Sequence, residues 1–203
     1  MDEILSRGLE HLGLVLVATL IAVALGLPLG VVCAARDRLR RPIIGVANVM
    51  QTVPSLALLG LLLPLPLIGG IGPRPAIVAL VLYALLPVLR ATDAGLRGVD
   101  PAVVEAGRGL GMTDRQLLLR VQLPLCAGVI LSGVRVATVI CIGVATIAAA
   151  IGAGGLGTFI FRGVAMVDHG LILRGAAPAA AMALLFDGAL GLLERRLQRA
   201  AGL

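Results

Sequence analysis

Long apolar runs constrain the fold of this chain more than any other feature. A helix needs about 20 mostly apolar residues to cross a bilayer. Five stretches approach or exceed that length: residues 12–35, 42–63, 74–90, 125–151 and 176–193. With 59% hydrophobic and 14% charged residues among 203, the chain has too little polar surface for a soluble domain of this size. We therefore predict one all-α integral membrane domain, residues 1–203, with five transmembrane helices surrounded by lipid.

The arginines indicate how these helices are oriented. All 17 basic residues are arginine, and twelve of them lie in three regions that fall on one side of the membrane: residues 36–41, 90–120 and 194–199. The opposite side carries Arg7, Arg74, Arg162 and Arg174. The positive-inside rule then places the N-terminus outside and the C-terminus in the cytoplasm. We read the basic charge as a topology signal and expect no nucleic-acid partner.

The cysteines and histidines give no sign of a metal site. Cys33, Cys126 and Cys141 lie in or beside apolar runs and form no CxxC pair, which is typical of small buried residues. His11 and His169 fall at predicted outer helix ends, where we expect solvated loop residues. The sequence contains no Walker motif and no convincing catalytic set. We predict that the chain is not an enzyme and holds no metal or cofactor of its own.

One polar stretch interrupts the apolar pattern between the third and fourth predicted helices. It covers residues 100–124, DPAVVEAGRGLGMTDRQLLLRVQLP, which fall on the predicted cytoplasmic side. Asp100 followed by Pro101 is typical of a helix start, and Gly109 and Gly111 indicate a turn. The TDRQ sequence that follows has the spacing of a capping box. We predict two short helices joined by a turn.

Such short helices need a surface to pack against. Isolated helices below about 12–15 residues are marginal in water. Valine and leucine alternate with arginine along this stretch, so both helices have apolar residues to bury. Two alternatives follow from the physics alone. The pair either docks on the ends of the chain's own helices or protrudes and docks on a cytoplasmic partner.

The spacing of this stretch resembles the EAA loop of ABC-importer membrane subunits, which reads E-A-A-x3-G-x9-I-x-L-P. Gly107 stands where the motif has its second alanine, and Val121 stands where it has isoleucine. The resemblance implies that the loop is a coupling helix held in a cleft of the ATP-binding subunit. The residues that it implies for this contact are Glu105, Ala106, Gly107, Gly111, Leu123 and Pro124.

Three further stretches, residues 51–60, 80–96 and 133–163, resemble membrane subunits that import quaternary-amine osmoprotectants such as glycine betaine, carnitine and choline. The resemblance implies a methionine-importer-like permease fold in a bacterial or archaeal cell membrane. It also implies three partners: an ABC ATPase dimer that binds ATP-Mg, a second permease subunit (in a homodimer or heterodimer), and an extracytoplasmic solute-binding protein.

The substrate is open to alternatives at this point. A quaternary ammonium is usually held by an aromatic cage, and this chain has only one tyrosine, three phenylalanines and no tryptophan. We therefore expect ligand recognition in the binding protein. Import of methionine or another small amino-acid-like solute is the alternative within the same class. A stand-alone secondary transporter or channel is a further one.

Polar residues within the second predicted helix allow two interpretations. Asn48, Gln51 and Thr52 lie in an apolar run, and Pro54 frees a backbone carbonyl there. These side chains either form hydrogen bonds between helices or line the transport path of a broken helix.

Two charges fall inside predicted membrane helices. Arg135 and Asp187 lie at similar depths when both are counted from the same side. Intramembrane charges usually pair with one another or face a cavity. We predict a contact between Arg135 and Asp187. The alternative is that Asp187 reaches the interface while Arg135 faces a subunit interface or a cavity.

Overall fold

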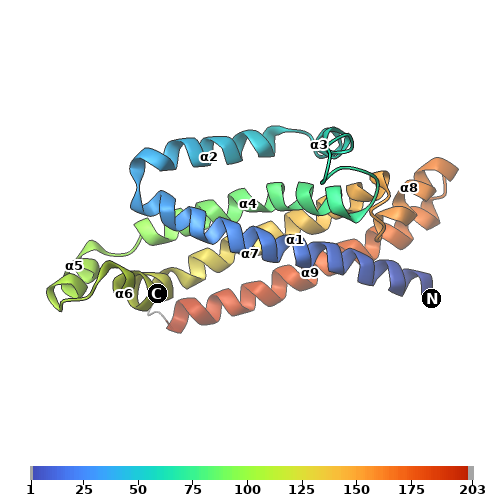
Figure 1. The fold of residues 1–203 in the computed structure, drawn as a ribbon. Helices are drawn as coiled ribbons and strands as arrows, with labels where there is room; N and C mark the ends of the chain where they lie inside the picture. Colours follow the sequence, from blue (N-terminus) through green and yellow to red (C-terminus); the bar gives the residue numbers. More distant parts are fainter. Residues whose placement is uncertain (1, 201–203) are drawn as a thin grey trace.

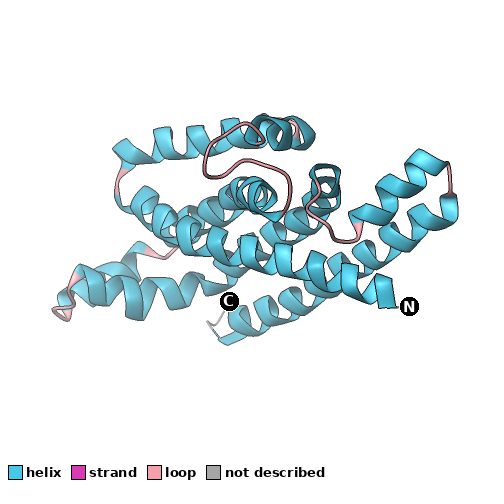
Figure 2. Cartoon of the chain, turned by 45° about the vertical axis from the view of Figure 1, so that its right-hand side comes forward, coloured by secondary structure: helices cyan, strands magenta, loops and turns pink. Residues whose placement is uncertain are grey.

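The structure, a computed structural model, describes residues 2–200 of the chain. Its elements are α1 (Asp2–Ala35), α2 (Asp37–Thr52), α3 (Ser55–Leu62), α4 (Pro73–Arg97), α5 (Pro101–Gly109), α6 (Asp114–Leu117), a π-helical turn (Leu118–Gln122), α7 (Leu123–Ala148), a 3-10 turn (Ala149–Ile151), α8 (Gly157–Met166) and α9 (His169–Ala200). Helices and loops make up the whole of this part of the chain (Figure 2). The predicted all-α fold is confirmed.

Four helices of the described chain are long and apolar enough to cross a membrane: α1, α4, α9 and the helical stretch from Asp114 to Ile151. They contain the predicted stretches 12–35, 74–90, 125–151 and 176–193. The fifth predicted stretch, residues 42–63, is divided between α2 and α3. These two helices pass the same test only together, and the chain bends by 99° between them.

Helix α4 lies at the centre of the bundle, between α1 and α7 (Figure 1). Glycines allow this close packing, because they have no side chain. A Cβ atom at Gly30 of α1 would lie 2.5 Å from the Cβ of Thr92, and one at Gly133 of α7 would lie 2.3 Å from the Cβ of Ala91. Small residues at such positions let helix backbones approach in a membrane protein. Helix α9 covers the other side of α7, and α2 runs beside α4.

The two ends of the bundle carry different elements (Figure 1). The start of α1 and the short helix α8 lie at one end, while α5, α6 and the end of α9 lie at the other. Residues that the arginine pattern assigns to opposite sides of the membrane therefore gather at opposite ends. Helix α8, an apolar helix of 10 residues in the predicted outer region, was not expected from the sequence.

The second helix predicted within residues 100–124 is not a separate short helix. Helix α6 continues through the π-helical turn into α7, so residues 114–151 form one helical stretch. Pro124 has no N–H, and its ring crowds the carbonyl of Arg120 one turn earlier. The wider turn relieves this, because the N–H of Leu123 bonds to the carbonyl of Leu118, five residues before it.

The expectation that His11 is solvated is wrong. Its side chain is fully buried in α1, and a Cβ atom on Gly155 would lie 3.1 Å from its Nδ1 atom. The loop after α7 folds back over the start of α1, which local sequence at position 11 cannot reveal. His169 is exposed and the three cysteines are buried, as predicted.

The close packing around α4 gives a first prediction. We expect Gly133→Ala to lower the unfolding temperature, since the new methyl group would overlap Ala91 and the resulting overpacking costs roughly 1–3 kcal/mol. The matched control is Gly143→Ala in the same helix, where no atom lies within 4 Å of the new Cβ. Thermal unfolding of both variants in detergent measures the difference. Equal unfolding temperatures for the two variants would contradict the packing described here.

Candidate functional site

The polar loop, residues 100–124, begins with a capped helix. The Oδ1 atom of Asp100 accepts a hydrogen bond of 2.9 Å from the N–H of Ala102, and Pro101 occupies the first position of α5. At the start of α6, Thr113 and Gln116 form both hydrogen bonds of a capping box, 2.9 and 3.3 Å long. Both helix starts predicted from the sequence are confirmed. The caps satisfy backbone N–H groups where α5 begins and where the long helical stretch from α6 into α7 begins.

Two glycines shape the tip of the polar loop in different ways. Gly111 has a φ of +78°, a left-handed conformation that strongly favours glycine, and it makes the turn. Gly107 is the one buried residue of α5, and a Cβ atom there would lie 2.6 Å from the Cδ1 of Leu117. The glycine therefore lets α5 pack closely on α6. Gly109, also predicted at the turn, is the last residue of α5.

Most of the polar loop faces away from the bundle. Leu117 is buried, but Leu110 at the tip is 83% exposed, and Glu105 and Ala106 are exposed as well. A cavity of about 490 Å³ lies between the loop and the ends of α1 and α4; its lining includes Ala34, Leu96, Arg97, Arg108 and Leu118. The loop thus rests on the chain's own helices along one side only. Its α5 side is available to a partner.

A buried aspartate links three helices next to this loop. Asp93 of α4 is nearly inaccessible and accepts hydrogen bonds from Arg40 of α2 at 2.8 Å and from Arg97 at 3.0 Å. Arg97 also donates to Asp37 at 2.5 Å and to the backbone carbonyl of Cys33 at the end of α1 at 3.0 Å. The sequence analysis missed this cluster. An aspartate within an arginine-rich helix end was the available signal.

The polar residues of α2 hold it against α4. The Oδ1 atom of Asn48 accepts a hydrogen bond of 2.7 Å from Arg90. The side-chain amide of Gln51 donates a bond of 2.9 Å to the backbone carbonyl of Tyr83. Both partners belong to α4, so these contacts favour the interhelical alternative for Asn48 and Gln51.

Thr52 and Pro54 lie at the break between α2 and α3. The hydroxyl of Thr52 donates to the carbonyl of Val49 within its own helix, at 2.7 Å. Val53 and Pro54 are extended, which ends α2 before α3 starts at Ser55. The hydroxyl of Thr52 therefore bonds within α2.

The predicted contact between Arg135 and Asp187 is present. The Nε and Nη2 atoms of Arg135 donate to the two carboxylate oxygens of Asp187, at 2.5 and 2.7 Å. Arg135 also donates a hydrogen bond of 3.3 Å to Glu194. The sequence did not predict this second partner. Gly191 lies between the two acids on α9, and a Cβ there would lie 3.1 Å from the guanidinium. The spacing 187, 191, 194 along one helix face was the available signal.

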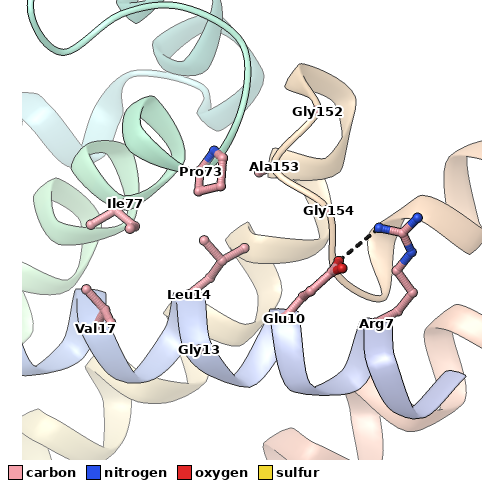
Figure 3. A pocket seen from close by; sticks show the side chains of 10 residues that line it. All are labelled: Arg7, Glu10, Gly13, Leu14, Val17, Pro73, Ile77, Gly152, Ala153 and Gly154. Atoms are coloured by element: carbon pink, nitrogen blue, oxygen red, sulfur yellow. Dashed lines mark hydrogen bonds and ion pairs between the residues drawn. The ribbon is translucent and has the colours of Figure 1, made fainter. Parts of the chain in front are cut away.

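At the opposite end of the bundle, a second cavity of about 500 Å³ lies between α1 and the glycine-rich loop after α7 (Figure 3). Glu10 accepts a hydrogen bond of 3.0 Å from the backbone N–H of Gly155 and pairs with Arg7 at 2.9 Å. The sequence gave no sign of this anchor on α1. The side chain of Glu10 ties this loop to the first helix.

Solved structures share this arrangement of helices. The methionine ABC transporter MetNI in an inward-facing conformation matches with a TM-score of 0.88 over 97% of each chain, at 22% identity. The crystal structure of an amino acid ABC transporter with histidines matches with a TM-score of 0.78 over 96% of this chain and 94% of that one, at 23% identity. The fold is that of ABC-transporter membrane subunits, as predicted.

Curated relatives are considerably more similar in sequence. The carnitine transport permease protein OpuCB of Listeria monocytogenes is 46% identical over 93% of this chain and 85% of its own. The choline transport system permease protein OpuBB of Bacillus subtilis is 43% identical, over 96% and 88%. The osmoprotectant import permease protein OsmW of Salmonella typhimurium is also 43% identical, over 91% and 87%.

Residues 26–199 match the family described as binding-protein-dependent transport system inner membrane component. The chain belongs to this family of multi-pass membrane proteins. The resemblance stated from the sequence, to ABC-importer membrane subunits of the quaternary-amine type, is confirmed.

The charge cluster between α7 and α9 gives a second prediction. We expect Arg135→Gln and Asp187→Asn each to lower the unfolding temperature, because each removes the bidentate contact that joins α7 to α9. The double variant should lose less than the sum of the two. A double-mutant cycle in detergent should give a favourable coupling between the two positions. Strict additivity of the two effects would show that the contact contributes nothing to stability.

Proposed function

We propose that this chain is the permease subunit of an ATP-driven importer of quaternary-amine osmoprotectants such as glycine betaine, carnitine or choline. The observation that carries the proposal is sequence identity of 43–46% to curated permeases with such names, over at least nine-tenths of this chain. The likeness to the methionine transporter, at 22% identity, supports the fold alone. Import of methionine or a similar solute is therefore the weaker alternative.

The polar loop faces the cytoplasm in this proposal and docks on an ABC ATPase dimer. The arginine distribution supports this orientation, with the N-terminus outside and the C-terminus inside. The exposed side of α5 offers Glu105 and Ala106 to the partner, and the turn at Gly111 presents the exposed Leu110. Gly107 supports the contact indirectly by packing α5 on α6.

Motion of the docked loop would be transmitted directly to the membrane helix α7. Because α6 continues into α7 through the π-helical turn, α7 has to move when the loop moves. Leu123 and Pro124 lie where the turn joins α7. The bidentate contact of Arg135 with Asp187 would carry the movement on to α9. The partner ATPase binds and hydrolyses ATP-Mg, so this chain is a permease and performs no catalysis itself.

Substrate would be delivered by an extracytoplasmic solute-binding protein and would cross between two permease copies. Four aromatic residues are too few and too scattered for the cage that a quaternary ammonium usually requires. The break between α2 and α3, with Asn48, Gln51, Thr52 and Pro54, is the candidate transport path. The bonds of Asn48 and Gln51 to α4 hold α2 in place beside this break.

Docking on the ATPase gives a third prediction. We expect Gly111→Val to reduce the amount of ATPase that co-purifies by about tenfold, because a left-handed conformation costs a non-glycine residue roughly 1–2 kcal/mol. Glu105→Ala should reduce it as well. Gly109→Val is the matched control, since open space surrounds that position. If both glycine variants retain the ATPase equally, the docking assignment is wrong.

The substrate class gives a fourth prediction. In a host without its own osmoprotectant uptake, expression of this chain with its ATPase and binding protein should restore growth at high salt when choline, carnitine or glycine betaine is supplied. Omission of this chain is the control. Uptake of labelled methionine by the same cells, with no uptake of the three quaternary amines, would favour the alternative substrate.

A further inference from the structure

The break between α2 and α3 leaves a backbone carbonyl without its usual helical partner. Val53 and Pro54 adopt extended conformations, with ψ angles of 127° and 135°. The first backbone bond of α3 runs from the N–H of Leu58 to the carbonyl of Pro54, at 2.9 Å. The carbonyl of Val53 lies just before that bond. In an apolar environment an unsatisfied carbonyl is unfavourable, because neither water nor lipid supplies a donor there.

Tyr83 of α4 supplies the missing partner. Its hydroxyl donates a hydrogen bond to the carbonyl of Val53. Tyr83 is 8% exposed as a residue and belongs to the same buried cluster as Leu58 and Leu59 of α3. The backbone carbonyl of Tyr83 also accepts the hydrogen bond from Gln51 of α2. One residue of α4 therefore contacts both the end of α2 and the break that follows it. Tyr83 is also the only tyrosine of the sequence.

This hydrogen bond distinguishes two conformations of the segment. In a straightened α2–α3 helix, the carbonyl of Val53 would bond to the N–H of Ala57, four residues later. The hydroxyl of Tyr83 would then lose its partner inside the core. The bond therefore stabilises the bent conformation relative to the straight one. An interaction made in one state only shifts the equilibrium between them.

We propose that the hydrogen bond from the hydroxyl of Tyr83 to the carbonyl of Val53 stabilises the bend between α2 and α3. Tyr83 is thereby a positioning residue for transport. Pro54 alone does not fix the bend, because a proline inside a helix commonly produces only a kink. The structural part of this inference is independent of function. Its consequence for transport rests on the proposed function, in which the break shapes the solute path.

The test compares two variants that each lose one hydroxyl near the break. Tyr83→Phe removes the bond to Val53 and keeps the ring. Thr52→Val removes a hydroxyl that bonds only within α2. Spin labels are attached at cysteines introduced for the exposed Val46 of α2 and Leu61 of α3, with the three buried native cysteines replaced. Labelled chain is diluted with unlabelled chain so that each assembly carries one labelled copy.

Pulsed electron-spin distance measurements on the purified complex give the result. We expect a single short distance for the unmodified chain and for Thr52→Val. Tyr83→Phe should add a longer, straightened population, with the bent-to-straight ratio reduced on the order of tenfold. Identical distance distributions for Tyr83→Phe and Thr52→Val would overturn the proposal, whatever the chain transports.

Uptake kinetics test the positioning role. Tyr83→Phe should lower the maximal uptake rate several-fold with little change in KM and with the same amount of ATPase bound, because substrate capture belongs to the binding protein. A straightened population together with unchanged uptake would overturn the positioning role. A third variant, Pro54→Ala, tests the same bond with Tyr83 intact, in case Tyr83→Phe fails to fold. The α2–α3 segment of Pro54→Ala should stay largely bent, because Tyr83 still bonds to Val53. A straight helix in Pro54→Ala would contradict the proposal.

Discussion

Every backbone N–H and C=O of an apolar chain needs a partner within the protein, and three irregular points of the structure show how this requirement is met. At the break after α2, the hydroxyl of Tyr83 serves the carbonyl of Val53. At Pro124, the helix widens into a π-helical turn instead of ending. In the glycine-rich loop after α7, the N–H of Gly155 finds the carboxylate of Glu10. Water could supply these partners in a soluble protein, whereas lipid cannot.

Continuous helices and ion pairs connect the polar loop to the rest of the bundle. The polar loop is joined to α7 without interruption, and α7 is bound to α9 through Arg135 and Asp187. On the other side, α4 holds α1 and α2 through Asp93 and its arginines. A displacement of the loop in the proposed importer would thus act on several helices that are joined by hydrogen bonds and ion pairs.

The sequence predicted what depends on local pattern. Apolar length gave the membrane helices, and the Asp100 and Thr113 caps gave both helix starts of the polar loop. It also predicted the contact between Arg135 and Asp187, because both charges lie at similar depths. It failed at other places where distant segments meet. The burial of His11 depends on a loop more than 140 residues away, as does the anchor at Glu10. Glu194 and Asp93 were missed because charges near helix ends usually signal topology, and only packing shows which of them are paired. The roles of the loop residues in docking stay predictions.

The central claim is that this chain moves a quaternary amine when a partner hydrolyses ATP. The most direct measurement is uptake into proteoliposomes that contain the chain and its ATPase, with ATP inside and the binding protein outside. The account predicts ATP-dependent accumulation of labelled choline, carnitine or glycine betaine that needs all three components. Accumulation of these solutes without ATP, or of methionine in their place, would contradict it.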